Sequence, residues 1–164
     1  MNRTSYHPCK PFEMSQLILM IGLPGSGKSF FATQLKVNHP DYQLISTDTI
    51  RAQLFGDEDI QGPWLRVWSQ VQQQFQKGVQ EATDVIYDAT NTQRRQRKDV
   101  ITVAREIGFH PIFAVWVNTP LEKCLQRNQN RPRQVPEEII LKMHRQLTDV
   151  PPSLEEPLDS LIIL

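Results

Sequence analysis

QLILMIGLPGSGKS, residues 16–29, is the stretch that decides the fold of this chain. An apolar run leads into a glycine-rich turn, and an amphipathic segment follows it. The run predicts a buried strand and the amphipathic segment predicts a helix. Between them lies a match to G-x-x-x-x-G-K-[ST], the Walker A pattern of a phosphate-binding loop. The residues that meet the pattern are Gly22, Gly27, Lys28 and Ser29.

The chemistry of this loop suits a bound triphosphate. Glycines lack a Cβ, so backbone N–H groups can approach phosphate oxygens, and the anion then lies at a helix N-terminus. Lys28 would place its ammonium on the β- and γ-phosphates, and the Ser29 hydroxyl would bind Mg²⁺. The alternative is a plain turn with an exposed lysine. We expect ATP and Mg²⁺ as ligands, with an ATP-binding set of Gly22, Leu23, Pro24, Gly25, Ser26, Gly27, Lys28, Ser29 and Phe30.

Composition limits the classes of protein that this chain can belong to. The 164 residues include 18 basic and 18 acidic side chains, which argues against a long nucleic-acid groove that depends on counterion release. No apolar run reaches the roughly 18 residues that span a bilayer, and the first residues lack a signal-peptide core. We expect a cytoplasmic protein without a membrane partner. Cys9 and Cys124 are far apart and indicate two reduced thiols, not a zinc site or a disulfide framework.

Strand and helix patterns alternate along the chain. Strands are expected at 42–46, 84–87 and 111–117, with a last short apolar run at 161–164. Helices are expected at 29–37, 49–55, from 62 onward, up to Gly108, after Thr119-Pro120, and at 136–149. In the helix after residue 62, an apolar stripe of core residues is expected at Trp64, Trp68, Val71, Phe75 and Val79. The alternation predicts an α/β fold with a central parallel sheet of about five strands and helices on both faces. We expect a leader at 1–15 and one domain at 16–164.

Two acidic residues follow predicted strands. Asp48 and Arg51, in the sequence STDTIR, can share one helix face, where the carboxylate could accept a hydroxyl proton and the arginine could bind phosphate oxygens. A helix cap or a surface salt bridge is the alternative. Asp88, in VIYDATN, follows the next strand and could bind Mg²⁺ with Ser29, or could build a turn. Because parallel strands end at one edge of a sheet, these residues should converge there.

The remaining polar signals are basic. The run Arg94, Arg95, Arg97 and Lys98 is typical of a solvated helix face, with a phosphate contact as the alternative. The segment QRNQNRPRQVP, residues 126–136, is typical of a mobile lid that closes over the γ-phosphate and excludes water. A surface basic turn is the alternative. Arg127 and Arg131 have the spacing of one helix face, and Arg133 is the weakest candidate of the three lid arginines. Thr90 and Asn91 could belong to the site or to a turn.

The motifs GLPGSGKS, STDTIR, VIYDATN and RNQNRPRQVP occur in the order seen in the kinase domain of phage-type polynucleotide 5′-hydroxyl kinases. The resemblance covers about residues 14–151. It implies the P-loop kinase fold with an arginine-bearing helical lid. It also implies transfer of the ATP γ-phosphate to a 5′-OH end of DNA or RNA, with Asp48 as base, Arg51 on the acceptor phosphate and Arg131 at the transferring group. The working residues of that family match Lys28, Ser29, Asp48, Arg51, Arg127 and Arg131.

Other functions fit the same motifs. The polynucleotide kinase that defines the family carries a phosphatase domain after the kinase domain, and this chain ends where that domain would begin. Related P-loop kinases that act on sugars, antibiotics or other metabolites share the first three motifs. A P-loop ATPase or nucleotide switch that acts on a partner is a further alternative, although it needs no D-x-x-R element. The sequence names no protein partner.

Overall fold

The computed structural model of this chain describes residues 14–164. Nearly all of the expected leader, and Cys9 with it, lie outside the described residues. Strands and helices alternate as the sequence predicts, with bounds shifted by a few residues. In chain order the elements are β1 (Leu17–Ile21), α1 (Lys28–Asn38), β2 (Gln43–Ser46), α2 (Thr47–Phe55), α3 (Trp64–Gln80), β3 (Val85–Asp88), α4 (Arg94–Ile107), β4 (Ile112–Trp116), α5 (Leu121–Gln129), α6 (Glu137–Asp149) and β5 (Ser160–Ile163).

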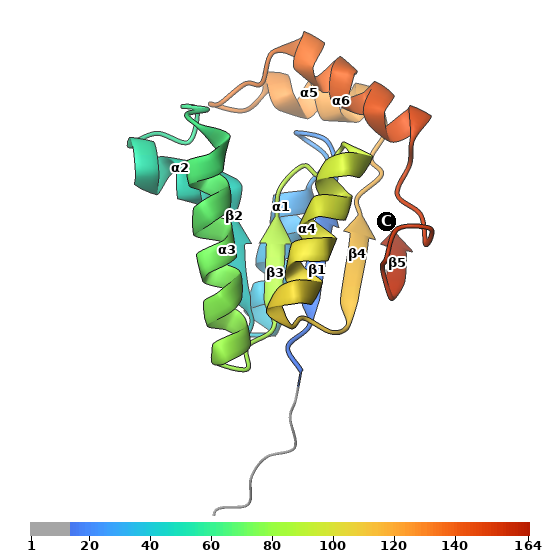
Figure 1. Cartoon of the computed structure of the whole chain (residues 1–164). Helices are drawn as coiled ribbons and strands as arrows, with labels where there is room; N and C mark the ends of the chain where they lie inside the picture. The colour runs from blue at the N-terminus through green and yellow to red at the C-terminus, as the bar shows by residue number, and fades with distance from the viewer. Residues whose placement is uncertain (1–13) are drawn as a thin grey trace, which may run out of the picture.

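The five strands form one parallel sheet in the order β2-β3-β1-β4-β5 (Figure 1). Register fixes which strand ends are neighbours, because Asp88 at the end of β3 pairs with Met20 of β1 and with Ser46 of β2. Adjacent strands lie about 4.8 Å apart. The residues that follow β1, β2 and β3 therefore meet at one edge, as the sequence predicts.

Helices cover both faces of the sheet, which confirms the predicted α/β architecture. On one face α1 packs its buried Ala32 against Ile18 and Met20 of β1. On the other face α3 and α4 cover alternate residues of the same strands, such as Leu19. In Figure 1, α3 and α4 lie in front of the sheet and α1 lies behind it. The central strand β1 is buried on both sides, so its sequence is an unbroken apolar run.

The stripe predicted for α3 forms the main contact of that helix with the core. Val71 and Phe75 are fully buried, and Trp68 and Val79 are partly buried against the core. Trp64 departs from the prediction, because it lies in the first turn, stacks on Trp68 and stays 43% exposed. The core therefore begins one turn later than the sequence stripe does.

A buried ion pair joins α4 to the segment before β5. The side chains of Arg97 and Glu156 are both 0% exposed, and their charged groups lie 2.6 Å apart. Arg97 also donates to the carbonyl oxygens of Asn91, Thr92 and Val150. Arg97 is buried, so the expectation that it lies on a solvated helix face was wrong. Its partner Glu156 is 59 residues away in the sequence, so no local pattern indicates the pair. Arg95 and Lys98 are exposed as expected.

Helices α5 and α6 lie over the carboxyl ends of the strands (Figure 1). The loop between them is closed by Asn128, whose side chain donates to the Val135 carbonyl and accepts from the Val135 N–H. We call residues 130–134 the lid loop. Across residues 14–164, every helix is too short or too polar to cross a membrane.

Candidate active site at the carboxyl ends of the strands

The phosphate-loop sequence forms a tight turn between β1 and α1. Gly25 and Gly27 have φ angles of +80° and +97°, in the left-handed region that favours glycine. A Cβ on Gly25 would also collide with the backbone carbonyl of Cys124 in α5. Gly27 is the N-cap residue of α1, so the backbone N–H groups at the helix start point into the turn. This geometry is that of an anion-binding cradle.

Lys28 lies at the centre of the cradle. Its Nζ is 2.9 Å from Oδ1 of Asp88 and 3.2 Å from Oγ of Ser29. Both side chains of the Lys28–Asp88 pair are nearly buried, at 11% and 7% exposure. Lys28 and Ser29 belong to the phosphate loop and Asp88 to a segment 60 residues further on, and the structure brings the three side chains together. Two oxygen donors beside one ammonium provide the ligand types that Mg²⁺ prefers.

Asn91 shapes the turn after β3. It has a φ of +49° and donates from Nδ2 to the Met20 carbonyl oxygen at 2.7 Å. Thr90 accepts a backbone hydrogen bond from the N–H of Gly22 through its carbonyl oxygen. Both residues therefore link the end of β3 to the phosphate-loop strand. Asn91 is buried, so it belongs to the framework of the site.

Asp48 and Arg51 lie together on α2. Arg51 Nη1 is 3.0 Å from Asp48 Oδ1, and the Arg51 side chain is only 14% exposed. The helix begins at Thr47, earlier than the predicted 49, and Ser46 is its N-cap residue, with its Oγ accepting from the Thr49 N–H. The cap interpretation of Asp48 was therefore wrong. Within residues 14–164, the Nε of Arg51 has no hydrogen-bond partner.

The three lid arginines lie in different places. Arg127, in α5, donates from Nη1 to the carbonyl oxygens of Gly25 and Ser26, both at 3.2 Å, and so contacts the phosphate loop. Arg131 is exposed in the lid loop. The predicted common helix face for these two was wrong, because α5 ends at Gln129. A residue that the sequence did not single out, Thr119, donates to the same Ser26 carbonyl at 2.8 Å.

Arg133 makes the lid-loop contact with Asp48. Its Nη1 lies 2.9 Å from Asp48 Oδ2 and 3.4 Å from Oε1 of Glu58, and its Nε pairs with Asp59. Burial lowers the pKa of Arg133, but the carboxylates of Asp48, Glu58 and Asp59 outweigh this, so its pKa is raised overall. From the sequence, Arg133 is the weakest candidate of the three arginines, because no local pattern indicates its contact with Asp48, which is 85 residues away.

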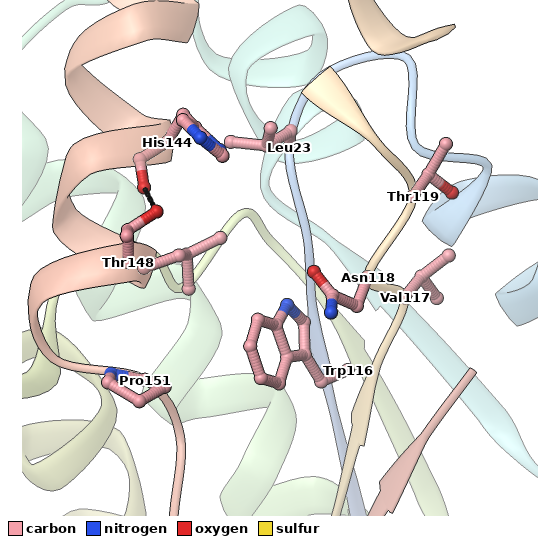
Figure 2. Close-up of a pocket in the computed structure, with 9 residues that line it drawn as sticks. Leu23, Trp116, Val117, Asn118, Thr119, His144, Thr148 and Pro151 are labelled. Atoms are coloured by element: carbon pink, nitrogen blue, oxygen red, sulfur yellow. Dashed lines mark hydrogen bonds between the residues drawn. The ribbon is translucent and has the colours of Figure 1, made fainter. Parts of the chain in front are cut away.

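A hollow of about 310 Å³ lies beside the phosphate loop, between the end of β4 and α6 (Figure 2). Leu23 of the loop, Trp116 and Leu147 supply apolar walls, and Asn118 and His144 supply polar groups. In Figure 2 the rings of Trp116 and His144 face the hollow from the two elements. Leu23 is thus shared between the phosphate loop and this hollow.

The sheet order, the phosphate loop and the acidic residues after β2 and β3 define the class of the protein, which is an α/β domain with the P-loop kinase fold. A family model described as an AAA domain matches residues 17–150, and the chain belongs to that family.

The proteins that are similar to this chain are named for different activities. L-seryl-tRNA(Sec) kinase of Methanococcus maripaludis is 26% identical over 141 residues, which are 78% of this chain and 51% of that protein. A chain of the Pnkp1/Rnl/Hen1 RNA repair complex superposes with a TM-score of 0.76 and 24% identity over 89% of this chain and 47% of that chain. A gluconokinase from Sinorhizobium meliloti 1021 superposes with a TM-score of 0.58 and 15% identity over 94% of this chain and 83% of that chain. The chain spans about half of the first two proteins, and the two structures show the fold alone.

Proposed function

We propose that this chain is a phosphotransferase that moves the γ-phosphate of ATP to a hydroxyl group, and that this hydroxyl is the 5′-OH end of a DNA or RNA strand. The observation that carries the proposal is the position of the Asp48–Arg51 pair. Asp48 lies two residues after Ser46, and Ser46 of β2 pairs with Asp88 of the neighbouring strand β3. A carboxylate and a guanidinium beside a phosphate cradle suit a hydroxyl acceptor, whereas ATP hydrolysis needs no such pair.

The donor half of the proposal rests on the phosphate loop. ATP would lie with its phosphates against the N-terminus of α1 and with Lys28 on the β- and γ-phosphates. Ser29 and Asp88 have the oxygen donors that would bind Mg²⁺, directly or through its waters. When bound, Mg²⁺ would supply positive charge that neutralises the phosphate oxygens.

The acceptor half rests on Asp48 and Arg51. The acceptor oxygen attacks the γ-phosphorus, its proton passes to Asp48, and the bond from the γ-phosphorus to the β-phosphate oxygen breaks to release ADP. Arg51 holds a guanidinium beside Asp48, at 3.0 Å from its carboxylate, and this guanidinium would bind an acceptor phosphate. Positioning the two reactants supplies much of the rate enhancement in such transfers.

Arg127 and Arg131 would neutralise the transferring phosphate from the lid side. Arg127 already contacts the phosphate loop, so it needs little rearrangement to reach a bound nucleotide. Arg131 lies exposed in the lid loop, and it would reach the γ-phosphate when the loop closes. Closure would also exclude water that otherwise hydrolyses ATP.

The nucleic-acid acceptor is supported by two likenesses and by the lid sequence. The matched tRNA kinase and RNA repair complex are both named for RNA. The R-N-x-x-R-x-x-x-V-P segment is the motif that tilts the resemblance toward polynucleotide ends. A net charge of zero suits a pocket for one strand end and few phosphates.

A small-molecule kinase is the second candidate. The fold match to a gluconokinase covers 94% of this chain, and it supports a compact hydroxyl compound as acceptor. The two candidate functions use the same phosphate donor and differ in the acceptor molecule that would lie beside Asp48 and Arg51. An acceptor assay therefore separates them.

The test is transfer of labelled γ-phosphate from ATP, with Mg²⁺, to a short oligonucleotide with a 5′-OH end. Wild type, Asp48→Asn and the exposed control Asp99→Asn are compared. We expect labelled oligonucleotide with wild type and with the control, and a loss of about 100-fold or more with Asp48→Asn. ATP affinity should stay near normal in all three proteins.

Other products would assign other functions. Label on gluconate or another small hydroxyl compound, with none on the oligonucleotide, would support the second candidate. Free phosphate as the only product would support an ATPase. Unchanged transfer by Asp48→Asn would remove Asp48 from the base role.

A further inference from the structure

Arg133 links two parts of the molecule that lie far apart in the sequence. It comes from the lid loop, and its guanidinium contacts Asp48 on α2 and also Glu58 and Asp59 in the loop between α2 and α3. Its side chain is only 18% exposed, although its acidic partners are about half exposed. The lid loop therefore reaches the acceptor side of the site, and its arginines do not all serve the donor side.

The two oxygens of the Asp48 carboxylate each have their own arginine. Oδ1 is 3.0 Å from Nη1 of Arg51, and Oδ2 is 2.9 Å from Nη1 of Arg133. A carboxylate has about four lone-pair directions, so two contacts leave both oxygens able to accept a further proton or hydrogen bond. Two fixed contacts also define the plane of the carboxylate. Asp48 is 43% exposed, so a hydroxyl can approach it from solvent.

We propose that Arg133 is a positioning residue for phosphate transfer, which together with Arg51 fixes the orientation of the Asp48 carboxylate toward the acceptor hydroxyl. This inference rests on the kinase function proposed above. Because Glu58 and Asp59 contact the same guanidinium, Arg133 stays in place when the acceptor occupies the free lone pairs of Asp48. Arg133 acts through Asp48 and does not touch the transferring phosphate.

A competing role is a latch that blocks the acceptor until it is displaced. A latch would be released by the acceptor, so removing Arg133 would speed the reaction and lower KM for the acceptor. A positioning residue has the opposite effect, because a misplaced base lowers kcat. The two roles therefore predict changes of opposite sign.

The experiment is a double-mutant cycle on transfer to the accepted hydroxyl, using wild type, Arg133→Ala, Asp48→Asn and the combined variant. Arg145→Ala is the control, because Arg145 is an exposed arginine of α6. We expect Arg133→Ala to lower kcat about 10- to 100-fold while KM for ATP stays within about twofold. In the Asp48→Asn background the same change should cost less than about threefold, since the base through which Arg133 acts is absent. Arg133→Lys should recover part of kcat, because it keeps the charge but not the planar fork.

Several outcomes would overturn the inference. Equal losses in the two backgrounds would show that Arg133 acts independently of Asp48. A rise in kcat, or a fall in KM for the acceptor, would assign the latch. A lower thermal midpoint together with a weaker ATP affinity in Arg133→Ala would assign a structural role.

The same assays test the proposed function separately from the role of Arg133. If wild type labels a small compound and not the oligonucleotide, the nucleic-acid acceptor is wrong, and the cycle measured with that compound still decides the role of Arg133. If wild type labels no hydroxyl at all, both proposals fall.

Discussion

The ammonium of Lys28 lies 2.9 Å from the carboxylate of Asp88, 60 residues further along the chain, and both side chains are nearly buried. Lys28 belongs to the start of α1 and Asp88 to the end of β3, so the pair joins the phosphate loop to the neighbouring strand. In the function proposed above, Lys28 would bind the β- and γ-phosphates of ATP. The carboxylate of Asp88 therefore balances the positive charge of Lys28 within the fold.

Removing one partner of this pair should destabilise the fold more than removing both. Lys28→Met leaves the Asp88 carboxylate buried without its cation, and we expect the free energy of unfolding to fall by about 3 kcal/mol. Lys28→Met combined with Asp88→Asn should recover part of that loss. Urea unfolding of wild type and the two variants checks this, and a double variant no more stable than Lys28→Met would contradict it. Phosphate transfer should be lost in both variants.

Gly25 should tolerate alanine less well than Gly56 does. Both glycines have φ near +80°, so each substitution costs about 1 kcal/mol of backbone strain. At Gly25 the added Cβ would meet the carbonyl of Cys124, whereas at Gly56 no atom of residues 14–164 lies within 4 Å of it. We expect Gly25→Ala to lose a further 1–3 kcal/mol or so and to weaken ATP binding. Thermal unfolding and nucleotide titration of both variants test this, and equal effects would argue against the contact with α5.

The Arg97–Glu156 pair should also show strong coupling. Arg97→Met leaves the buried Glu156 carboxylate without its cation, and we expect a loss of about 3–5 kcal/mol in the free energy of unfolding. The combined variant Arg97→Met with Glu156→Gln should be more stable than Arg97→Met alone. Denaturant unfolding measures both, with Arg95→Met as the exposed control. A loss below about 1 kcal/mol for Arg97→Met would mean that the pair adds little.

Asp159 should make stability depend on acid pH. The Ile112 N–H donates to its carboxylate at 2.6 Å and Arg105 pairs with it, which outweighs burial and lowers the pKa of Asp159 below its ordinary 3.8. A group whose pKa is lowered on folding stabilises the protein above its ordinary pKa, and the stabilisation is lost as pH falls through the folded value. Asp159→Asn should therefore be less stable than wild type at pH 7, and the difference should shrink as the pH falls below the ordinary pKa and through the folded pKa of Asp159. A difference that persists in acid would contradict this assignment.

Local patterns in the sequence were enough to predict the framework of the site. The apolar run of β1, the glycines after it and the two acidic residues at strand ends can be recognised from short windows, since burial and turn geometry impose them locally. The parallel sheet then brings Ser29, Asp48 and Asp88 to one edge without further information.

What could not be predicted depends on contacts across long stretches of chain. Arg97 looks like a surface residue because three basic neighbours surround it, and only the distant Glu156 explains its burial. Arg133 pairs with Asp48 across 85 residues. The expected helix face shared by Arg127 and Arg131 failed because α5 ends before Arg131, where Asn128 turns the chain back to Val135. No single-sequence pattern encodes which side chain meets which at such distances.

The two hydrogen bonds between Asn128 and Val135 fix the distance between the end of α5 and the start of α6. They close the lid loop at its base, so residues 130–134 lie between two chain ends that are held together. Arg127 remains outside the loop, on the phosphate cradle. Because the same short loop carries Arg131 and Arg133, a change in its length would shift both arginines together, while Arg127 would keep its contacts with the phosphate loop.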